Sequence, residues 1–374
     1  MNKKFHLWEF YNSQKVSVDL SEQSRDNFAR LVKGNISKIA YKSKITPSRM
    51  YDYFINKKTP IPLDKLMNIS KLLSINLYDI EKEILSYKQK LVPIKNSIFN
   101  PILPLKISPY FTSIVSNLFF DGSLPRDGKG AYYNQKRKTI MDLFTKKLEK
   151  VFGDIQFSVK KDHRGVLKCR FPRIAGEISK EIYEVKTFHG DFARLSKRIL
   201  SLNKENKTAF LTSAILDEGS IAYDGHIIFG VNNKLLCEDM LNLSKDLGLS
   251  VSELKNKKHS NFYYFHIKSL KKLLQLVETL SEDFPLISLD YKLERLKKAL
   301  EIKEQNYKYT KDFSDKRKDM ILKELFKKSQ TINQLASKLL IPPRTIRRYM
   351  YYLIMVNKIE RVKLGNEYLY FLKS

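Results

Sequence analysis

Two acidic residues, Asp121 and Glu218, each follow an apolar stretch and each precede a Gly-Ser pair. The stretches, within residues 111–123 and 210–220, are apolar on nearly every face and too short to cross a membrane, so they predict two buried helices. The glycine after each acid suits the left-handed turn that ends many helices. A buried acid at a helix C-terminus is costly, because the dipole there is already negative. Two such acids on paired helices would be stabilised by a cation between them, whereas one copy alone would indicate an ordinary turn.

The segments that follow the two acids repeat one series of elements, as tandem structural repeats do. A basic residue begins the last helix of each copy: Arg173 follows Asp121 by 52 residues, and Lys268 follows Glu218 by 50. The similar spacings predict an α+β fold with two α-β-β-α-β-β-α units. The matching segments are β-type (131–135 and 225–232), amphipathic helices ending in Gly (139–153 and 234–248) and further strands (167–171 and 262–267).

These paired motifs resemble the LAGLIDADG (dodecapeptide, DOD-type) homing endonucleases in their single-chain form. Residues 114–122 and 211–219 match the two nonapeptide motifs, and Ser116 and Ser213 occupy the small-residue position that lets the helices touch. The resemblance covers residues 105–285. The surrounding sequence is similar to that of free-standing archaeal members with flanking helix-turn-helix segments. The residue before the first acid is usually small in this family. Here it is Phe120, and Asp217 occupies that position in the second motif.

The resemblance implies a catalytic site at the tips of the two helices. Asp121 and Glu218 would hold Mg²⁺ together with adjacent helix-end carbonyls, because this hard cation prefers oxygen ligands. The metal would activate water and stabilise the leaving oxygen of one phosphodiester per DNA strand. Lys268 and Arg173 would supply positive charge near the scissile phosphate. The predicted catalytic residues are therefore Asp121, Glu218, Lys268 and Arg173.

In the family the strands form two curved antiparallel sheets over double-stranded DNA. Because alternate strand residues share a face, Tyr133, Gln135 and Arg137 are the first-repeat candidates for DNA contacts. The alternative is a solvated sheet whose lysines guard its edge against aggregation. The second-repeat candidates are Asn232 and Asn233, with the basic positions Lys255, Lys257, Lys258 and His259.

The composition favours a polyanionic partner. The chain has 69 Lys and Arg against 40 Asp and Glu, a net charge of +29. It has neither a membrane-spanning apolar run nor the apolar core of a secretion signal, so DNA is favoured over a membrane surface. Cys169 and Cys237 lie in apolar contexts that fit reduced buried thiols of a cytosolic protein. With the family resemblance, these features predict a monomeric, nucleoid-associated protein of a prokaryotic, archaeal cell.

The N-terminal segment is helical in pattern, with Pro47 at the start of a helix over residues 48–56. Its short helices and tight turn are similar to the Cro and phage-repressor helix-turn-helix family, in which the second helix enters the major groove. Ser48 and Arg49 would then face base edges. The alternative is a small helical bundle that binds protein.

The C-terminal segment predicts three helices, the last starting with Pro343, and a β-hairpin turning at Gly365 and Asn366. This order resembles a winged helix-turn-helix, and the alternative is a winged helix that makes dimer contacts. Its predicted groove and phosphate contacts are Arg344, Arg347 and Arg348, with Lys363 in the wing.

The sequence thus predicts two LAGLIDADG repeats between two DNA-binding domains. The predicted function is a site-specific double-stranded DNA endonuclease, and the alternative is a non-cleaving DNA-binding transcriptional regulator built on the same core. The predicted boundaries are 1–90 (helix-turn-helix domain), 91–106 (linker), 107–185 (repeat 1), 186–207 (bridge, helical and basic), 208–286 (repeat 2), 287–311 (helical spacer) and 312–374 (winged helix-turn-helix domain).

Overall fold

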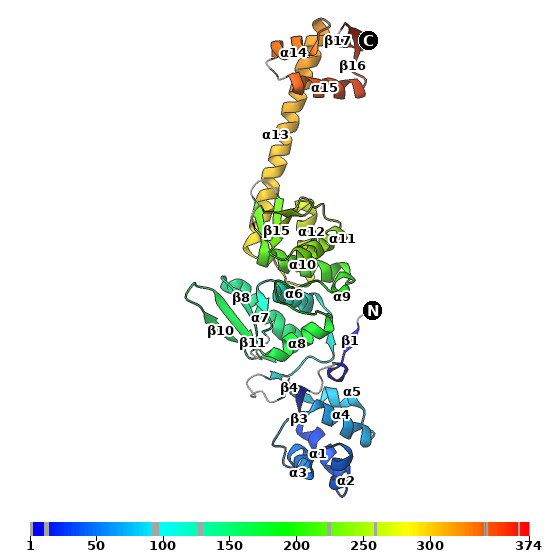
Figure 1. Cartoon of the computed structure of the whole chain (residues 1–374), viewed down its shortest axis with the longest axis vertical. Helices are drawn as coiled ribbons and strands as arrows, with labels where there is room; N and C mark the ends of the chain where they lie inside the picture. The colour runs from blue at the N-terminus through cyan, green and yellow to red at the C-terminus, as the bar shows by residue number, and fades with distance from the viewer. Residues whose placement is uncertain are drawn as a thin grey trace. The chain divides into compact units, whose positions relative to one another are not determined.

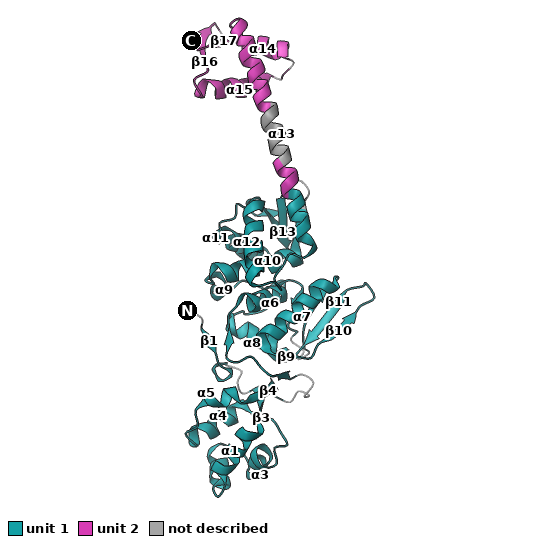
Figure 2. Ribbon diagram, turned by 180° about the vertical axis from the view of Figure 1, so that it is seen from behind, with its two compact units in different colours: residues 1–299 teal, residues 300–374 magenta. Residues whose placement is uncertain are grey.

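The chain forms two compact units, Met1–Ala299 and Leu300–Ser374 (Figure 2). Among the described residues, no helix is long and apolar enough to cross a bilayer. Lys258, His259 and Asn366 lie outside the described residues. The computed structural model (Figure 1) describes residues 3–10, 15–90, 97–125, 130–222, 226–257, 260–339, 341, 343–365 and 367–373, without the side chains of 222 and 305–313.

The centre of the first unit contains the two predicted repeats, each with the order α-β-β-α-β-β-α. Helices of each repeat cover one face of an antiparallel sheet (Figure 1). Repeat 1 comprises α6 (Pro109–Phe119), β7 (Gly122–Ser123), β8 (Ala131–Gln135), α7 (Lys138–Phe152), β10 (Ser158–Lys161), β11 (Leu167–Phe171) and α8 (Arg173–Ile182). Repeat 2 comprises α10 (Lys204–Glu218), β12 (Gly219–Ala222), β13 (His226–Val231), α11 (Lys234–Asp246), β14 (Lys255–Asn256), β15 (Tyr263–Ile267) and α12 (Leu270–Asp283).

The two sheets have related strand orders, β10-β11-β8-β7 and β12-β13-β15-β14. The strand after each acid pairs in the same register in both repeats: Gly122 lies opposite Tyr133, and Gly219 lies opposite Phe229. Tyr133 and Phe229 are therefore equivalent positions. Both rings are fully buried.

The helices α6 and α10 begin with side-chain caps and end close to the acids. Ser108 accepts a hydrogen bond from the Phe111 amide, and Asn203 caps α10 in the same way. The predicted left-handed turns are absent, because Gly219 is extended, with φ −75° and ψ 140°, and Gly122 has no positive φ. Glycine is required for space instead. A Cβ at Gly219 would lie 2.6 Å from the Ile215 oxygen, and a Cβ at Gly122 would lie 2.6 Å from the Leu118 Cα.

The N-terminal region contains the predicted helices and also a five-stranded antiparallel sheet that the sequence prediction missed. Its order is β3-β2-β4-β5-β9, and β9 lies between α7 and β10 of repeat 1, so strands from both sides of the predicted linker share one sheet. The alternation in β2, Val-Ser-Val-Asp-Leu, is the signal that was overlooked. The strands are β2 (Val16–Leu20), β3 (Ile61–Pro62), β4 (Ile84–Gln89), β5 (Ile98–Phe99) and β9 (Asp154–Ile155). The helices are α1 (Glu22–Val32), α2 (Ile36–Lys42), α3 (Pro47–Met50), the π-helical η3 (Tyr51–Ile55), α4 (Leu63–Leu72) and α5 (Leu77–Lys82).

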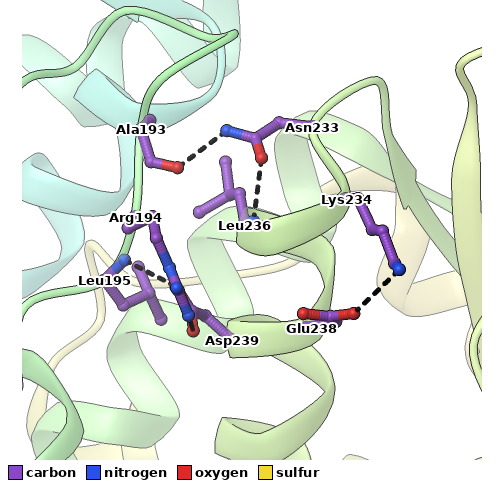
Figure 3. A network of polar contacts seen from close by, with 8 residues as sticks. All are labelled: Ala193, Arg194, Leu195, Asn233, Lys234, Leu236, Glu238 and Asp239. Atoms are coloured by element: carbon purple, nitrogen blue, oxygen red, sulfur yellow. Dashed lines mark hydrogen bonds and ion pairs between the residues drawn. The ribbon is translucent and has the colours of Figure 1, made fainter.

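Shorter elements complete the first unit. The predicted helical bridge over residues 186–207 is wrong, because only α9 (Lys197–Leu200) and the start of α10 are helical there. The segment before α9 is held by side chains of α11 instead, as Figure 3 shows: Arg194 pairs with Asp239 at 2.7 Å. The remaining elements are β1 (Lys4–Phe5), η1 (Leu7–Glu9) and β6 (Leu105–Lys106), where β1 pairs with β6.

The second unit has its own core of buried apolar side chains, including Ile321, Leu335, Ile346 and Tyr370. A bridge between Gln330 and Tyr370 adds a third short extended segment to its hairpin. Its elements are the C-terminal part of α13 (Tyr291–Lys327), α14 (Ile332–Leu339), α15 (Pro343–Met355), β16 (Ile359–Leu364) and β17 (Glu367–Leu372).

Candidate functional site

The site begins with the packing of α6 against α10. Ser113 and Ser213 share a hydrogen bond of 2.6 Å between their hydroxyls, and the Ser116 hydroxyl donates to the Phe210 carbonyl at 2.8 Å. These small buried residues allow the two helices to touch, as predicted for Ser116 and Ser213. The contact brings the C-terminal ends of both helices to one place.

Asp121 and Glu218 meet at these ends, each close enough to respond to the same charges. Removal of water by the surrounding protein raises the pKa of Asp121 to about 6, and the Lys292 ammonium partly opposes this shift. The same removal of water raises the pKa of Glu218 to about 7, and the negative charge of Asp121 raises it further. The structure therefore brings the two predicted acids together, and both carboxylates would be stabilised by additional positive charge.

A third acid, Asp217, lies beside this pair and was not predicted as a site residue. Its carboxylate accepts hydrogen bonds from the Asn117 amide at 2.8 Å and from the Tyr133 hydroxyl at 2.7 Å. Burial raises the pKa of Asp217 to about 8, and the charge of Asp121 adds to that shift. Asp217 belongs to repeat 2, yet both of these partners belong to repeat 1.

A buried lysine of repeat 1 extends this polar network. Lys147 is only 4% exposed, and its ammonium donates to the Ser113 hydroxyl at 2.6 Å and to the side-chain amide oxygen (Oδ1) of Asn117 at 2.9 Å. Burial lowers the pKa of Lys147 to about 8, and the charge of Asp217 opposes this. Sequence reasoning missed Lys147. The available signal was its position on the apolar face of α7, with Phe144 and Leu148.

A second buried lysine approaches the acids from the first turn of α13. Lys292 is 6% exposed, and its ammonium donates to the carbonyls of Ile215, Leu216 and Gly219 at 2.9, 2.7 and 2.6 Å. Burial lowers the pKa of Lys292 to about 8, although the charges of the three nearby acids oppose the shift. The highly charged pattern around this residue predicts only a helical spacer, and nothing in that pattern marks Lys292 as buried.

The two predicted catalytic cations have other contacts. Arg173 donates to the Pro125 carbonyl and pairs with Glu177 at 2.7 Å. Lys268 is exposed after β15, and its backbone amide donates to the Ser250 carbonyl at 2.8 Å. The lysine whose charge acts on both Asp121 and Glu218 is Lys292.

The acid pair fits a divalent cation in part. Asp121 and Glu218 provide carboxylate oxygens, which Mg²⁺ prefers, and their raised pKa values indicate a deficit of nearby positive charge. Two helix-end carbonyls on either side of Glu218, those of Leu216 and Gly219, accept hydrogen bonds from Lys292. Metal binding by helix-end carbonyls of α10 stays a prediction. Within the described residues, no group of three or more His, Cys, Asp or Glu side chains is arranged to hold a metal. A bound cation would therefore also take ligands from water or phosphate.

The outward face of the first sheet is basic. Lys168 and Arg170 of β11 point away from the core, opposite Asn134 and Tyr132 of β8, and the Lys168 ammonium lies 3.6 Å from the centroid of the Tyr132 ring. The predicted DNA contact of Tyr133 is wrong, because this residue is fully buried.

The neighbouring predicted residues of the first repeat are partly exposed or exposed, but each has a protein contact. The Gln135 amide donates to the Tyr133 hydroxyl at 3.3 Å. Arg137 is exposed, and its guanidinium lies 3.7 Å from the centroid of the Tyr291 ring.

The outward face of the second sheet is aromatic. The rings of His226 and His266 stack at 4.5 Å, and Tyr264 lies 5.6 Å from His266. Asn232 is exposed, as a DNA contact requires. Asn233 instead caps α11, and its amide donates to the Ala193 carbonyl (Figure 3). The same amide also donates to the Gly190 carbonyl, so the polar atoms of Asn233 are used within the protein.

The predicted contact residues in the flanking regions are exposed. Ser48 and Arg49 lie on α3, which Thr46 caps. Those of the second unit lie on α15 and β16 and are Arg344, Arg347, Arg348 and Lys363.

No protein-family model matches the sequence, and neither does any curated protein. The chain has a distant structural similarity to mesophilic variants of the homing endonuclease I-DmoI, with 15% identity over 46% of this chain and 94% of that chain and a TM-score of 0.33. The structure of I-DmoI in complex with DNA and Mn has 16% identity over 46% of this chain and 96% of that chain, with a TM-score of 0.33. Full-length DUF199/WhiA from Thermatoga maritima has 12% identity over 66% of this chain and 90% of that chain, with a TM-score of 0.33. Similarity this distant says nothing about activity.

Proposed function

We propose that the chain is a DNA-binding protein whose central repeats form a site-specific, Mg²⁺-dependent endonuclease for double-stranded DNA. The observation that supports this most directly is the meeting of Asp121 and Glu218, one from each repeat, at the ends of two helices in contact. The basic outward face of the first sheet and the net charge of +29 support a nucleic-acid partner. One chain supplies both acids, so we propose a monomer.

In this proposal Asp121 and Glu218 would hold Mg²⁺, which would supply an activated water and charge stabilisation for phosphodiester hydrolysis. Lys168 and Arg170 would bind phosphates and orient the duplex. Lys268 and Arg173 stay in the proposal as sources of positive charge toward the DNA backbone, and Gln135, Arg137 and Asn232 as contacts at its edge.

The flanking regions would add sequence recognition. Three helices followed by a hairpin in the second unit fit a winged helix, whose third helix, α15, would enter the major groove. Arg344, Arg347 and Arg348 would contact bases and phosphates there, with Lys363 in the wing. In the N-terminal region, α3 would present Ser48 and Arg49. The domain boundaries remain those that the sequence predicts.

The test is cleavage of a genomic DNA library in Mg²⁺, followed by sequencing of the ends. We expect the parent protein to cut at one recurrent site, and Asp121→Asn and Glu218→Gln to bind the same DNA and lose at least about a hundredfold in rate. Equal cutting by parent and variants would show a contaminating nuclease and overturn the proposed site.

The second candidate is a regulator that binds DNA without cutting it. It is favoured by Lys292, whose ammonium bonds to the helix-end carbonyls at which a metal ligand was expected, and by the bulky Phe120 beside Asp121. Retention of both acids favours the nuclease. Site-specific binding with no cutting in Mg²⁺, Mn²⁺ or Ca²⁺ would establish the regulator.

A further inference from the structure

The end of α10 is satisfied by a side chain from outside both repeats. The last carbonyls of a helix lack backbone partners, and a lysine can bond to them and oppose the negative end of the dipole. All three donors of the Lys292 ammonium are used in this way, on carbonyls before and after Glu218. The side chain is nearly enclosed, so these bonds replace almost all of its hydration.

The charges around this ammonium are mainly negative. Asp217, Asp121 and Glu218 all attract it, and Arg295 is the one basic group among its main electrostatic neighbours. A buried ammonium is costly unless it is hydrogen-bonded and near opposite charge. Lys292 has three hydrogen bonds to carbonyls and lies within the electrostatic influence of three acids. Its position combines a helix C-terminus with an acid cluster, which is a combination that otherwise favours a metal ion.

The same turn of α13 also contacts the other repeat. The ring of Tyr291 lies under the guanidinium of Arg137, which precedes α7, at 3.7 Å from its centroid. Neighbouring residues of one helical turn thus hold both halves of the core at their junction.

We propose that Lys292 is a built-in cation of the acid site: a positioning residue that fixes the end of α10, and with it Glu218, without a bound metal ion. This inference goes beyond the proposed function and does not require DNA cleavage. It assigns to the first turn of α13 a role in completing the core. A cation that remains in place would also keep the acids together in the absence of DNA.

The test measures urea unfolding of the full chain in EDTA and in Mg²⁺, without DNA. In EDTA we expect Lys292→Met to lower the folding equilibrium constant of the core by about a hundredfold or more, because it leaves buried carbonyls and acids without their partner. Lys292→Arg should lose less, since it keeps the charge. The matched control is Lys297→Met, which removes a partly exposed lysine of the same helix paired with Glu278 and should change little.

Mg²⁺ and an acid substitution separate a cation role from packing. Mg²⁺ should stabilise Lys292→Met more than the parent, because the ion can replace the missing charge. Adding Glu218→Gln should reduce the effect of Lys292→Met, since the two side chains are coupled. Equal losses with and without Glu218→Gln, together with no Mg²⁺ response, would overturn the proposal. So would Lys292→Met unfolding like the parent in EDTA.

A measurement on the parent protein covers the case in which Lys292→Met does not fold. Amine acylation followed by mass spectrometry should modify Lys297 rapidly and leave Lys292 protected until the core unfolds. Modification of both lysines at similar rates in the folded protein would contradict the proposal.

Discussion

The two repeats share a backbone and differ in chemistry at the position before each acid. In repeat 1 that position is Phe120, whose ring packs against Phe229 of repeat 2 at 5.6 Å. In repeat 2 it is Asp217, whose carboxylate bonds to Tyr133 of repeat 1. Each side chain therefore reaches the equivalent ring of the opposite repeat, and one of these contacts is apolar while the other is polar.

The same difference between a polar and an apolar side recurs in the helices α7 and α11. Lys147 and Leu243 occupy the same position counted from the first residues of α7 and α11, and both are buried. Lys147 belongs to the repeat whose ring, Tyr133, makes the polar contact, and Leu243 belongs to the repeat whose ring, Phe229, makes the apolar contact. A buried acid is thus tolerated only where amide, hydroxyl and ammonium groups surround it, and a duplicated fold can carry such a network on one side alone.

The largest expected effect is on the lysine of this pair. Lys147→Met should destabilise the core by about 3–5 kcal/mol, because it removes one member of a buried charged network and leaves the others without a partner. The matched change Leu243→Met conserves volume and apolarity, so it should cost less than about 1.5 kcal/mol. Urea unfolding monitors both. Similar losses in the two variants would show that the polar side of the core is no more demanding than the apolar side.

The acids predict that stability depends on pH. The pKa values of Asp121, Glu218 and Asp217 are raised to about 6, 7 and 8 in the folded protein. Between pH 4 and pH 7 these acids bind more protons in the folded chain than in the unfolded chain, so stability should fall as pH rises. Above about pH 7 the lowered pKa values of Lys147 and Lys292 act in the opposite direction. The slope is about 1.4 kcal/mol per pH unit for each proton of difference.

The measurement is urea unfolding in EDTA at several pH values. Asp217→Asn should reduce the slope of the decline between pH 5 and pH 7 by up to about 1.4 kcal/mol per pH unit, whereas Phe120→Leu, at the equivalent position, should leave the decline unchanged. Saturating Mg²⁺ should flatten the decline from Asp121 and Glu218, since a bound cation favours their charged forms. A stability that rises over this pH range would contradict the assignment of raised pKa values.

Exchanging the two equivalent rings tests the comparison directly. Tyr133→Phe removes the hydroxyl that donates to Asp217 and should cost about 1.5–3 kcal/mol. Phe229→Tyr introduces a hydroxyl among Phe120 and other buried rings and should cost about 1–3 kcal/mol if it finds no partner. Thermal unfolding compares both with Tyr351→Phe on the exposed face of α15 as a control. A neutral Phe229→Tyr would mean that the apolar side admits water.

The smallest expected effect separates the outward faces of the two sheets. Lys168→Ala should reduce the slope of log binding constant against log salt by about 1, because one phosphate contact is lost. His266→Ala on the second sheet removes no Lys or Arg charge and should leave the slope unchanged. Fluorescence anisotropy with a fixed duplex at several salt concentrations measures both. Equal slopes for Lys168→Ala and the parent would remove the first sheet from the DNA interface.

The elements that carry periodic apolar patterns could be predicted from the sequence. The two buried helices, the acids at their ends and the element order of both repeats follow from such patterns. The strand β2 was missed although its alternation is visible, and Tyr133 was predicted as a DNA contact because Tyr132 and Tyr133 have similar side chains on opposite faces.

The buried charges could not be predicted in the same way. Lys292 and its carbonyl partners are separated by more than 70 residues, and nothing in a charged helical pattern marks one lysine as enclosed. Asp217 was recognised as an unusual residue in its motif, but its partners belong to the other repeat. Long-range polar contacts of this kind have no local signature, because they depend on which elements pack together.

The helix α13, which follows the two repeats, also supplies the lysine that caps α10. Since the cap of α10 belongs to the first turn of α13, a protein shortened at residue 286 would retain every residue of both repeats and still lack part of its central structure. Insertions between residues 286 and 292 would displace that cap in the same way. The second unit is therefore difficult to exchange or lose in evolution, because any new junction must preserve Lys292 within the core of the first unit.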